Sequence, residues 1–322
     1  MSQIMSRIRS RLAGAFTLAA LLCIGASFAR LVPSGHLLGP LARILDSFAP
    51  WFVILAMGLG IVTYLLGARR MAMVLYLLAM GHGGVMLVDH RAVSQPLAPG
   101  QLPELRVAFL NAQSDSHPQA ATEILAQVAR YNPDIAVFAE ASALWPARRA
   151  LGGAYRFVSP CPAPPCELMI AAQDTPLRHW TLPLNAIWDD RYGVLEAQTG
   201  QGTTFFLSVA HLTKPWFSGI AEGEVAQLIA QYRWFEEEAP RAPVIAVGDF
   251  NMAPWARHME QILTESGLRT LRAPVTTWPQ DAVMLRLPID QVLVSPGVHV
   301  TAVETFSTPA NHLGLIVDIA FD

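Results

Sequence analysis

The hydrophobic positions of this chain fall into two patterns, one toward each end of the sequence. Near the N-terminus, apolar runs occupy residues 12–29, 51–68 and 71–88, each close to the ~20 residues that a helix needs to cross a bilayer core. Beyond residue 105, short apolar runs alternate with segments of helical spacing, as in Ile124, Leu125 and Val128. The first pattern predicts about three transmembrane helices, and the second predicts an α/β fold.

Arginine residues flank the three apolar runs unevenly. Arg7, Arg9 and Arg11 precede the first run, and Arg69-Arg70 separates the second from the third. Because positive charge stays on the cytoplasmic side, both segments are expected inside, and three crossings then place everything after Asp89 outside. We therefore expect a multi-pass protein of the inner membrane whose C-terminal part lies on the periplasmic, extracytoplasmic side.

Two alternatives to three spans exist. Residues 1–29 have the basic start, the apolar middle and the small-x-small ending (Ser27-Phe28-Ala29) of a cleavable signal peptide. Two remaining spans would still leave the C-terminal part outside. Buried core helices are the other alternative, and the uniform apolarity of the runs argues against it.

Charge divides the chain at the same place. Residues 1–91 carry eight Arg, no Lys and two acids, a net charge of +6, whereas residues 92–322 carry 14 basic and 23 acidic groups, a net charge of −9. Residues 91–104 are rich in Pro, Gly and Gln and show neither a helical nor an alternating period. We predict a membrane region over residues 1–90, a linker over 91–104 and one α/β domain over 105–322.

Cysteine usage agrees with export. Two of the three cysteines stand in 161-CPAPPC-166, which in an oxidising compartment predicts a short disulfide loop between Cys161 and Cys166. A two-ligand metal site is the alternative, although neither a His nor a third Cys accompanies the pair. The proline-rich loop can also hold the two sulfurs apart.

The predicted elements of the α/β domain alternate along the chain. Helices are expected over residues 118–131, 141–151, 221–237 and 255–266. Strands are expected over residues 105–110, 135–139, 167–172, 192–197, 203–210, 244–247, 289–295, 299–305 and 314–320. About 220 residues of this kind suffice for one large core.

Polar side chains stand at the ends of six of these strands. They are Asn111, Glu140, His211, Asp249 with Asn251, Asp290 and His312. Each has an ordinary structural explanation by itself, as a turn former, a helix cap or a satisfied histidine. Strand edges are also where α/β folds place ligand sites, and the joint occurrence supplies the parts of one reaction.

The residue types in this set are suited to the steps of one type of reaction. A carboxylate such as Glu140 suits a hard cation, because Mg²⁺ prefers oxygen ligands. A second carboxylate can orient and deprotonate water, and a histidine can meet the charge that develops on a phosphoryl oxygen.

These residues resemble the motifs of the endonuclease/exonuclease/phosphatase superfamily of metal-dependent phosphoester hydrolases, over nearly all of residues 105–322. The motifs occur in order, and they are Val107-Ala-Phe-Leu-Asn111, Asp134 to Glu140, His211-Leu212, Gly248-Asp-Phe-Asn251, Thr277-Trp278-Pro279, Ile289-Asp290 and Ala310-Asn311-His312. The resemblance implies a four-layer α/β sandwich, in which two packed mixed sheets are flanked by helices.

The resemblance also implies a role for each residue. Glu140 would bind Mg²⁺ or Mn²⁺, with Asn111 nearby. Asp249 would orient or deprotonate the attacking water, and Asn251 would help to position it. His312, paired with Asp290, would stabilise the pentacoordinate phosphorus of the transition state. His211 would contact a phosphoryl oxygen.

One motif departs from the family, since Asn311 stands where its members usually have Asp. The amide keeps an oxygen for hydrogen bonding but removes a negative charge near the metal. This change implies weaker metal affinity or an altered rate, and it leaves open a catalytically silent membrane-anchored binding or scaffold protein.

The charge balance bears on the substrate. Nucleases hold a polyanion with clustered Lys and Arg, whereas residues 92–322 have a single lysine, Lys214, and a net negative charge. The pairs Arg148-Arg149 and Arg269/Arg272 could still form local basic patches. We therefore expect an integral membrane phosphodiesterase or phosphatase that acts on a lipid headgroup or a small phosphodiester, with a nuclease acting on DNA or RNA as the alternative.

Overall fold

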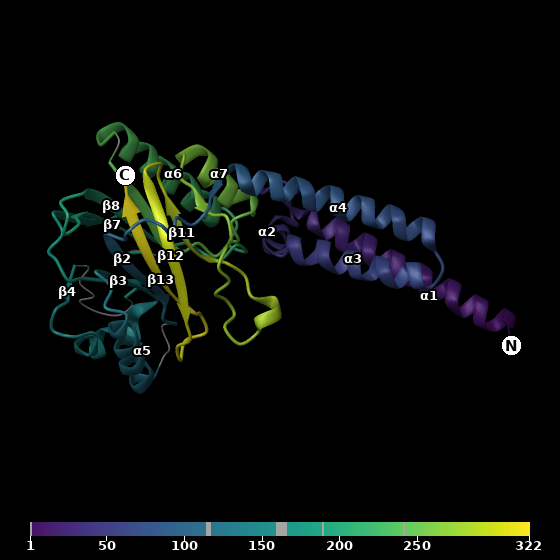
Figure 1. The fold of residues 1–322 in the computed structure, drawn as a ribbon, viewed down its shortest axis with the longest axis horizontal. Coiled ribbons are helices and arrows are strands. Elements are labelled where there is room, and N and C mark those ends of the chain that lie inside the picture. Colours follow the sequence, from purple (N-terminus) through teal and green to yellow (C-terminus); the bar gives the residue numbers. More distant parts are fainter. Residues whose placement is uncertain (1, 114–116, 159–165, 189, 241) are drawn as a thin grey trace.

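The computed structural model describes residues 2–113, 117–158, 166–188, 190–240 and 242–322. A set of long helices extends away from a body of sheets and shorter helices (Figure 1). The N-terminal elements are α1 (Ser2–Ser27), η1 (Ala29–Leu31), α2 (Gly39–Ser47), α3 (Ala49–Leu65) and α4 (Arg69–Ala92). The helices α1 and α4 both pack against α3, and also contact each other, through small side chains such as Ala20, Ala56 and Ala79.

The N-terminal helices are compatible with anchoring in a membrane. Gln3–Ser27 and Arg69–Ala92 are each long and apolar enough to span it, and Gly39–Ser47 with Ala49–Leu65 would make a third span bent by 71°. The bend follows from Pro50, which can begin α3 but cannot continue α2.

The basic end of these helices lies far from the sheets. The N-terminus and the turn between α3 and α4 are at the distal end of the helices (Figure 1). Arg9 ties the two together, because its guanidinium donates hydrogen bonds to the carbonyl oxygens of Leu65 at 2.8 Å and Leu66 at 2.7 Å. These carbonyls end a helix and have no partner within it, so a cation is favourable there.

The body of the molecule consists of two main sheets. One is six-stranded, in the order β12-β13-β2-β3-β5-β4, and the other is five-stranded, in the order β11-β9-β8-β7-β6. The first contains β2 (Leu105–Asn111), β3 (Ile135–Ala139), β4 (Arg156–Phe157), β5 (Leu168–Ala172), β12 (Val298–Phe306) and β13 (Gly314–Phe321). The second contains β6 (Arg178–Thr181), β7 (Tyr192–Gln198), β8 (Thr204–His211), β9 (Val244–Asp249) and β11 (Asp290–Val294). Both sheets mix parallel and antiparallel pairs.

Three apolar layers hold this body together. Inward-facing residues such as Val107, Leu207 and Val247 form the core between the two sheets. The outer face of the five-stranded sheet is covered by α6 (Ile220–Glu238) and α7 (Arg257–Ser266), and that of the six-stranded sheet by α5 (Pro118–Arg130) with η2 (Ala141–Ala143) and η3 (Trp145–Leu151). Strands buried on both faces explain the continuous apolar runs of the sequence. The four-layer α/β sandwich with mixed sheets is thus confirmed.

Several local features differ from the sequence-based expectations. Residues 141–151 form the 3₁₀ segments η2 and η3 instead of one α-helix, because Pro146 lacks an N–H and its ring obstructs a continuous helix. The element η4 (Val283–Leu285) and the pair β1 (Ser94–Gln95) and β10 (Thr270–Leu271) are too short to leave a period in the sequence.

Residues 91–104, which were expected to be a linker, lie along the sandwich. The strand β1 pairs in parallel with β10, and the amide of Ala98 donates to the carbonyl of Val300 at 2.9 Å. Cys166 is disulfide-bonded and Cys23 is a free thiol. Cys161 lies outside the described residues, and its pairing with Cys166 remains a prediction.

Candidate active site

The strand order brings the predicted residues to one edge of the sandwich. In the five-stranded sheet, β9 lies between β8 and β11, so that Asp249 is in register with both His211 and Asp290. In the six-stranded sheet, Asn111 at the end of β2 is in register with Ala139, which directly precedes Glu140. Five residues that are far apart in sequence therefore meet where the two sheets face one another.

Asp249 is the buried centre of this group, with 2% of its surface exposed. Its Oδ2 accepts a hydrogen bond from Asn111 Nδ2 at 2.9 Å, and its Oδ1 accepts one from the backbone amide of Asn251 at 2.8 Å. Burial and the negative charge of Asp290 raise the pKa of Asp249 above its ordinary value. The carboxylate is thus fixed in direction and made more basic.

Gly248 allows β9 to carry Asp249 to this position. A Cβ on Gly248 would lie 1.9 Å from the carbonyl oxygen of Ala210 on the adjacent β8. Only glycine permits this approach of two backbones, so Gly248 is required by packing and not by a turn.

The backbone at this edge adopts unfavourable conformations. Gln113, Glu140 and Asn251 have φ values of 57°, 49° and 52°, in the left-handed region that non-glycine residues rarely adopt. Asn251 is held there partly by its side chain, whose Nδ2 donates to the carbonyl of Leu212 at 2.8 Å. Such conformations cost free energy and cluster at functional sites, where the surrounding structure imposes them.

Asp290 and His312 form a buried pair. His312 Nδ1 lies 2.8 Å from Asp290 Oδ2, and each side chain is at most 6% exposed. Burial by itself lowers the pKa of His312, but the charge and the hydrogen bond of Asp290 outweigh it and raise that pKa to about 9. His312 is therefore an imidazolium at neutral pH. Because Nδ1 is bonded to Asp290, the ring presents Nε2 to its other neighbours.

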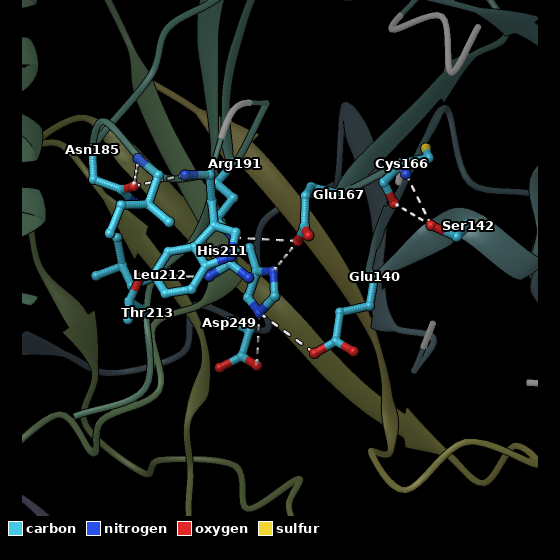
Figure 2. Close-up of polar contacts among 12 residues, drawn as sticks. Glu140, Ser142, Cys166, Glu167, Asn185, Arg191, His211, Leu212, Thr213 and Asp249 are labelled. Carbon is cyan, nitrogen blue, oxygen red and sulfur yellow. Dashed lines mark hydrogen bonds and ion pairs between the residues drawn. The ribbon is translucent and has the colours of Figure 1, made fainter. Parts of the chain in front are cut away.

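His211 is the centre of a second group of charges, which Figure 2 shows. Its Nδ1 lies 3.3 Å from Glu167 Oε2, and its Nε2 lies 3.7 Å from Glu140 Oε1 and 4.0 Å from Asp249 Oδ2. The guanidinium of Arg191 is 3.3 Å from the same Glu167 oxygen. Burial by itself raises the pKa of Glu167, but His211 and Arg191 outweigh it and lower that pKa.

A buried glutamate fixes the loop that follows His211. Glu224 on α6 is fully buried, and it accepts hydrogen bonds from the amide and the hydroxyl of Thr213, each at 2.6 Å. Asn185 Nδ2 also donates to it. Lys214 is the next residue in this loop, so Glu224 helps to position the Lys214 side chain although Glu224 itself does not line either cavity.

Glu167, Arg191 and Lys214 were not predicted from the sequence. Each lies within a few residues of a strand end, next to β5, β7 and β8 respectively. That is the same signal that identified the other residues, and it could have found these three. Asp134, in contrast, accepts a hydrogen bond from the amide of Arg106 at the opposite end of β3 and is structural.

A cavity of about 370 Å³ opens over these groups. Its polar wall consists of Asn111, Gln113, Glu140, Lys214, Asp249, Asn251, Asn311 and His312, and its apolar wall includes Ile44, Phe48, Trp216, Trp278, Leu287 and Ile289. A second cavity of about 260 Å³ shares Glu140 and Lys214 with the first and is also lined by Trp188, Arg191 and His211. Together they could accept a phosphoryl group with a substituent on either side.

The oxygen donors at this edge fit a hard divalent cation. Glu140 lines the cavity, and its Oε1 lies 3.3 Å from Asn111 Nδ2, so a carboxylate and an amide side chain stand together. Asp249, Asp290 and His312 also have donor atoms within 4.8 Å of one another. His312 Nδ1 and Asp290 Oδ2 are already bonded to each other, so Glu140 is the better placed ligand.

Fold and site together define a class, that of two-sheet α/β sandwiches with acids, amides and histidines gathered at one end. The model of the endonuclease/exonuclease/phosphatase family matches residues 107–312. The chain belongs to this family, whose members are phosphoester hydrolases and typically use divalent metals.

Solved structures share the sandwich at low sequence identity. The human Nocturnin catalytic domain with bound sulfate has 19% identity and a TM-score of 0.54, covering 69% of this chain and 96% of that one. A mannosyl-6-phosphatase from Bacteroides thetaiotaomicron has 17% identity and a TM-score of 0.54, covering 67% and 100%. TDP2 of D. rerio in complex with a single-strand DNA product has 17% identity and a TM-score of 0.53, covering 67% and 98%. A search of curated protein sequences finds no match.

Proposed function

We propose that this chain is a membrane-anchored, metal-dependent phosphoester hydrolase, a phosphodiesterase or phosphatase whose active site lies outside the cytoplasm. One observation carries the proposal. Asn111, Glu140, Asp249 and His312 line one cavity although they come from both sheets, His211 lines the adjoining cavity that shares Glu140, and Asp290 is bonded to His312 behind them.

The proposed roles follow from the contacts of each side chain. Asp249 accepts the proton of the attacking water, and Asn111 and the amide of Asn251 hold its two oxygens in a fixed direction. Its raised pKa makes it a better base than an exposed aspartate, and general base catalysis of this kind contributes about 10²–10⁴-fold. The Asn251 side chain, which is tied to Leu212, helps to position the water.

Two histidines, His312 and His211, stabilise the negative charge on the phosphoryl oxygens. His312, kept protonated by Asp290, donates to a phosphoryl oxygen as negative charge develops on it. His211, oriented by Glu167, contacts a second oxygen. Glu140, with Asn111 beside it, would hold Mg²⁺ or Mn²⁺, which when bound neutralises charge on the phosphoryl group.

Family membership and the molecule's charge pattern support the remaining parts of the proposal. Among the structural neighbours, one is a phosphatase by name and one is complexed with a DNA product. Nucleic acid is the less favoured substrate, because residues 92–322 have a net charge of −9 and one lysine. The arginines at the distal end of the helices support a cytoplasmic N-terminus and a periplasmic sandwich across the inner membrane.

The test is hydrolysis of bis-p-nitrophenyl phosphate by the full chain in detergent with Mg²⁺ or Mn²⁺. Asp249→Ala is expected to lower kcat by about 10²-fold or more, because the general base is lost. Asp174→Ala is the matched control, since Asp174 is exposed and lies near Asp134 at the other end of the sandwich. Equal rates for the wild type and Asp249→Ala would refute the catalytic assignment. Inertness toward phosphodiester, lipid, nucleotide and DNA substrates alike would favour a silent scaffold.

A further inference from the structure

The cavity over the candidate active site has a wall that belongs to the N-terminal helices. Ile44 and Ser47 of α2 and Phe48 at its junction with α3 line the same cavity as Asp249 and His312. Around them, Trp216, Leu287 and Ile289 complete an apolar side opposite the polar one. The part of the molecule that anchors it therefore also shapes the space in which the substrate binds.

This wall is held in place by directed contacts. Ser47 Oγ accepts from the amide of Ala253 at 3.2 Å, and the Ser47 carbonyl accepts from Trp255 Nε1 at 3.0 Å. Asp46 Oδ2 accepts from the amide of Arg257 at 2.7 Å, where it caps the first turn of α7. Ala253 follows Asn251 by two residues, so the junction is bonded to the loop that carries the site.

A second set of contacts joins α2 to the loop after Lys214. The guanidinium of Arg43 donates to the carbonyl of Pro215, to Ser218 Oγ and to the carboxylate of Glu222. The side chain of Arg43 is only 11% exposed. Such a charged group is rarely buried without partners, so these bonds indicate a fixed interface and not a casual contact.

The outer side of this junction is apolar and uncovered. Leu37 and Leu38, directly before α2, are 91% and 53% exposed, and Leu41 in its first turn is 51% exposed. In η4, Met284 is 85% exposed, and its carbonyl accepts a hydrogen bond from Trp51 Nε1 on α3. Large apolar residues gathered in this way mark an interaction surface, and here they adjoin helices that are long and apolar enough to span a membrane.

We propose that the site takes the phosphoester of a membrane lipid, and that Ile44 and Phe48 contact its apolar part while α2 and η4 lie in the bilayer interface. The proposal rests on the phosphoester hydrolase function put forward above. Three facts carry it jointly: the cavity's apolar wall comes from the α2–α3 junction, the exposed side of that junction is apolar, and both adjoin the helices of the anchor. A lipid can present its phosphoester to the polar wall and keep its acyl chains in the bilayer.

The experiment compares diacyl phospholipids with the corresponding deacylated glycerophosphodiesters, using the full chain in mixed micelles and bis-p-nitrophenyl phosphate as the soluble reference. We expect kcat/KM for the diacyl lipids to exceed that for the deacylated compounds by about 10²-fold, since one missing apolar contact in a pocket already changes it about 10-fold or more. Phe48→Ala and Ile44→Ala should each reduce this preference by about 10-fold, mainly through KM. Ile54→Ala, which removes an exposed side chain of α3 outside the cavity, is the matched control and should keep the preference.

Two outcomes separate the failure of this proposal from that of the proposed function. If hydrolysis of the soluble reference depends on Asp249 but acylation of the substrate brings no gain, the lipid proposal is overturned and the hydrolase stands. If no substrate is turned over in an Asp249-dependent way, the hydrolase itself is wrong. If Phe48→Ala misfolds, Met284→Asp is the replacement variant, because Met284 is exposed and lies outside the cavity. Met284→Asp should lower the rate of lipid hydrolysis on vesicles several-fold. An unchanged rate on vesicles would contradict the proposal.

Discussion

The Asp290–His312 pair permits a prediction with a distinctive pH dependence. Asp290→Asn keeps an oxygen that can accept the hydrogen bond from His312 Nδ1, but it removes the negative charge that holds the imidazolium. With Asp290 in place the pKa of His312 is about 9. Without that charge the pKa should fall to about 6.5, because burial lowers it and only the smaller effects of Asp249 and Glu140 still raise it.

The size of the effect follows from the fraction of His312 that is protonated. Near pH 8, a pKa of about 9 leaves about nine tenths of the imidazolium, whereas a pKa of about 6.5 leaves about 3%, a difference of roughly 30-fold. Near pH 6 the two fractions differ by less than about 1.5-fold. The kcat of Asp290→Asn should therefore fall about 30-fold relative to the wild type near pH 8 and little near pH 6.

The assay is a pH profile of kcat from about pH 5.5 to 9.5, with the soluble diester as substrate and saturating metal. In the wild type, the alkaline limb should lie near the pKa of His312, and in Asp290→Asn it should move down by more than two pH units. An equal loss at pH 6 and pH 8 would mean that Asp290 acts by geometry alone. An alkaline limb that does not move would refute the assignment of His312 as the group that meets the phosphoryl charge.

The same pair should also affect folding stability, with a definite sign. Because the pKa of His312 is raised in the folded state, its contribution is fully present below about pH 6.5 and is lost as the pH rises to about 9. A shift of about 2.5 pH units corresponds to about 3 kcal/mol, which Asp290→Asn should remove at pH 6 and not at pH 9.5. Thermal unfolding at the two pH values measures it.

Three further predictions follow from other parts of the structure. Gly248→Ala places a Cβ 1.9 Å from the Ala210 carbonyl oxygen and should lower the free energy of unfolding by about 3 kcal/mol. Gly223→Ala, in open space on α6, should raise that free energy slightly. Equal melting temperatures of the two variants would contradict the packing argument. Glu140→Gln should raise the Mg²⁺ or Mn²⁺ concentration needed for half-maximal activity by about 10-fold or more, and Asn311→Asp should lower it; activity that survives exhaustive chelation would refute metal dependence. An alkaline phosphatase reporter fused after Asp89 should be active in a bacterial host, and an inactive fusion would overturn the three-span topology.

Much of the sandwich was predictable because its strands are buried on both faces. The strands β2, β3, β8 and β9 are mostly apolar and buried, and each ends in, or is followed by, a polar residue that local propensity does not require. That contrast between a buried strand and a polar end is visible without a structure. The convergence of these ends is a consequence of strand order, which the resemblance to a family supplied and periodicity alone could not.

The missed features depend on long-range contacts. Glu167 and Arg191 stand at strand ends, which the sequence shows, but their contacts with each other and with His211 arise from the way in which β5 and β7 are placed. The strand β6 is largely exposed, and β1 and β10 have two residues each, so none has a hydrophobic period to detect. Ile44 and Phe48 line the same cavity as Asp249, although they precede it by about 200 residues in the sequence. No local pattern in the sequence indicates this proximity.

These long-range contacts change how the protein should be studied. A fragment that begins near residue 92 contains every candidate catalytic residue, yet it lacks the Ile44–Phe48 wall and the Asp46 cap of α7. Removal of α2 would also leave Trp255 Nε1 and the amide of Ala253 without the partners that Ser47 provides. These two residues follow Asn251, whose backbone is in the left-handed region, by four and two positions. The amide of Asn251 holds the carboxylate of Asp249, and the surrounding contacts hold the backbone of Asn251. The fragment should therefore orient the Asp249 carboxylate less well, in addition to losing contacts with the substrate. We therefore expect the N-terminal helices and the sandwich to act as one functional unit, and the activity of the full chain is the measurement that bears on its function.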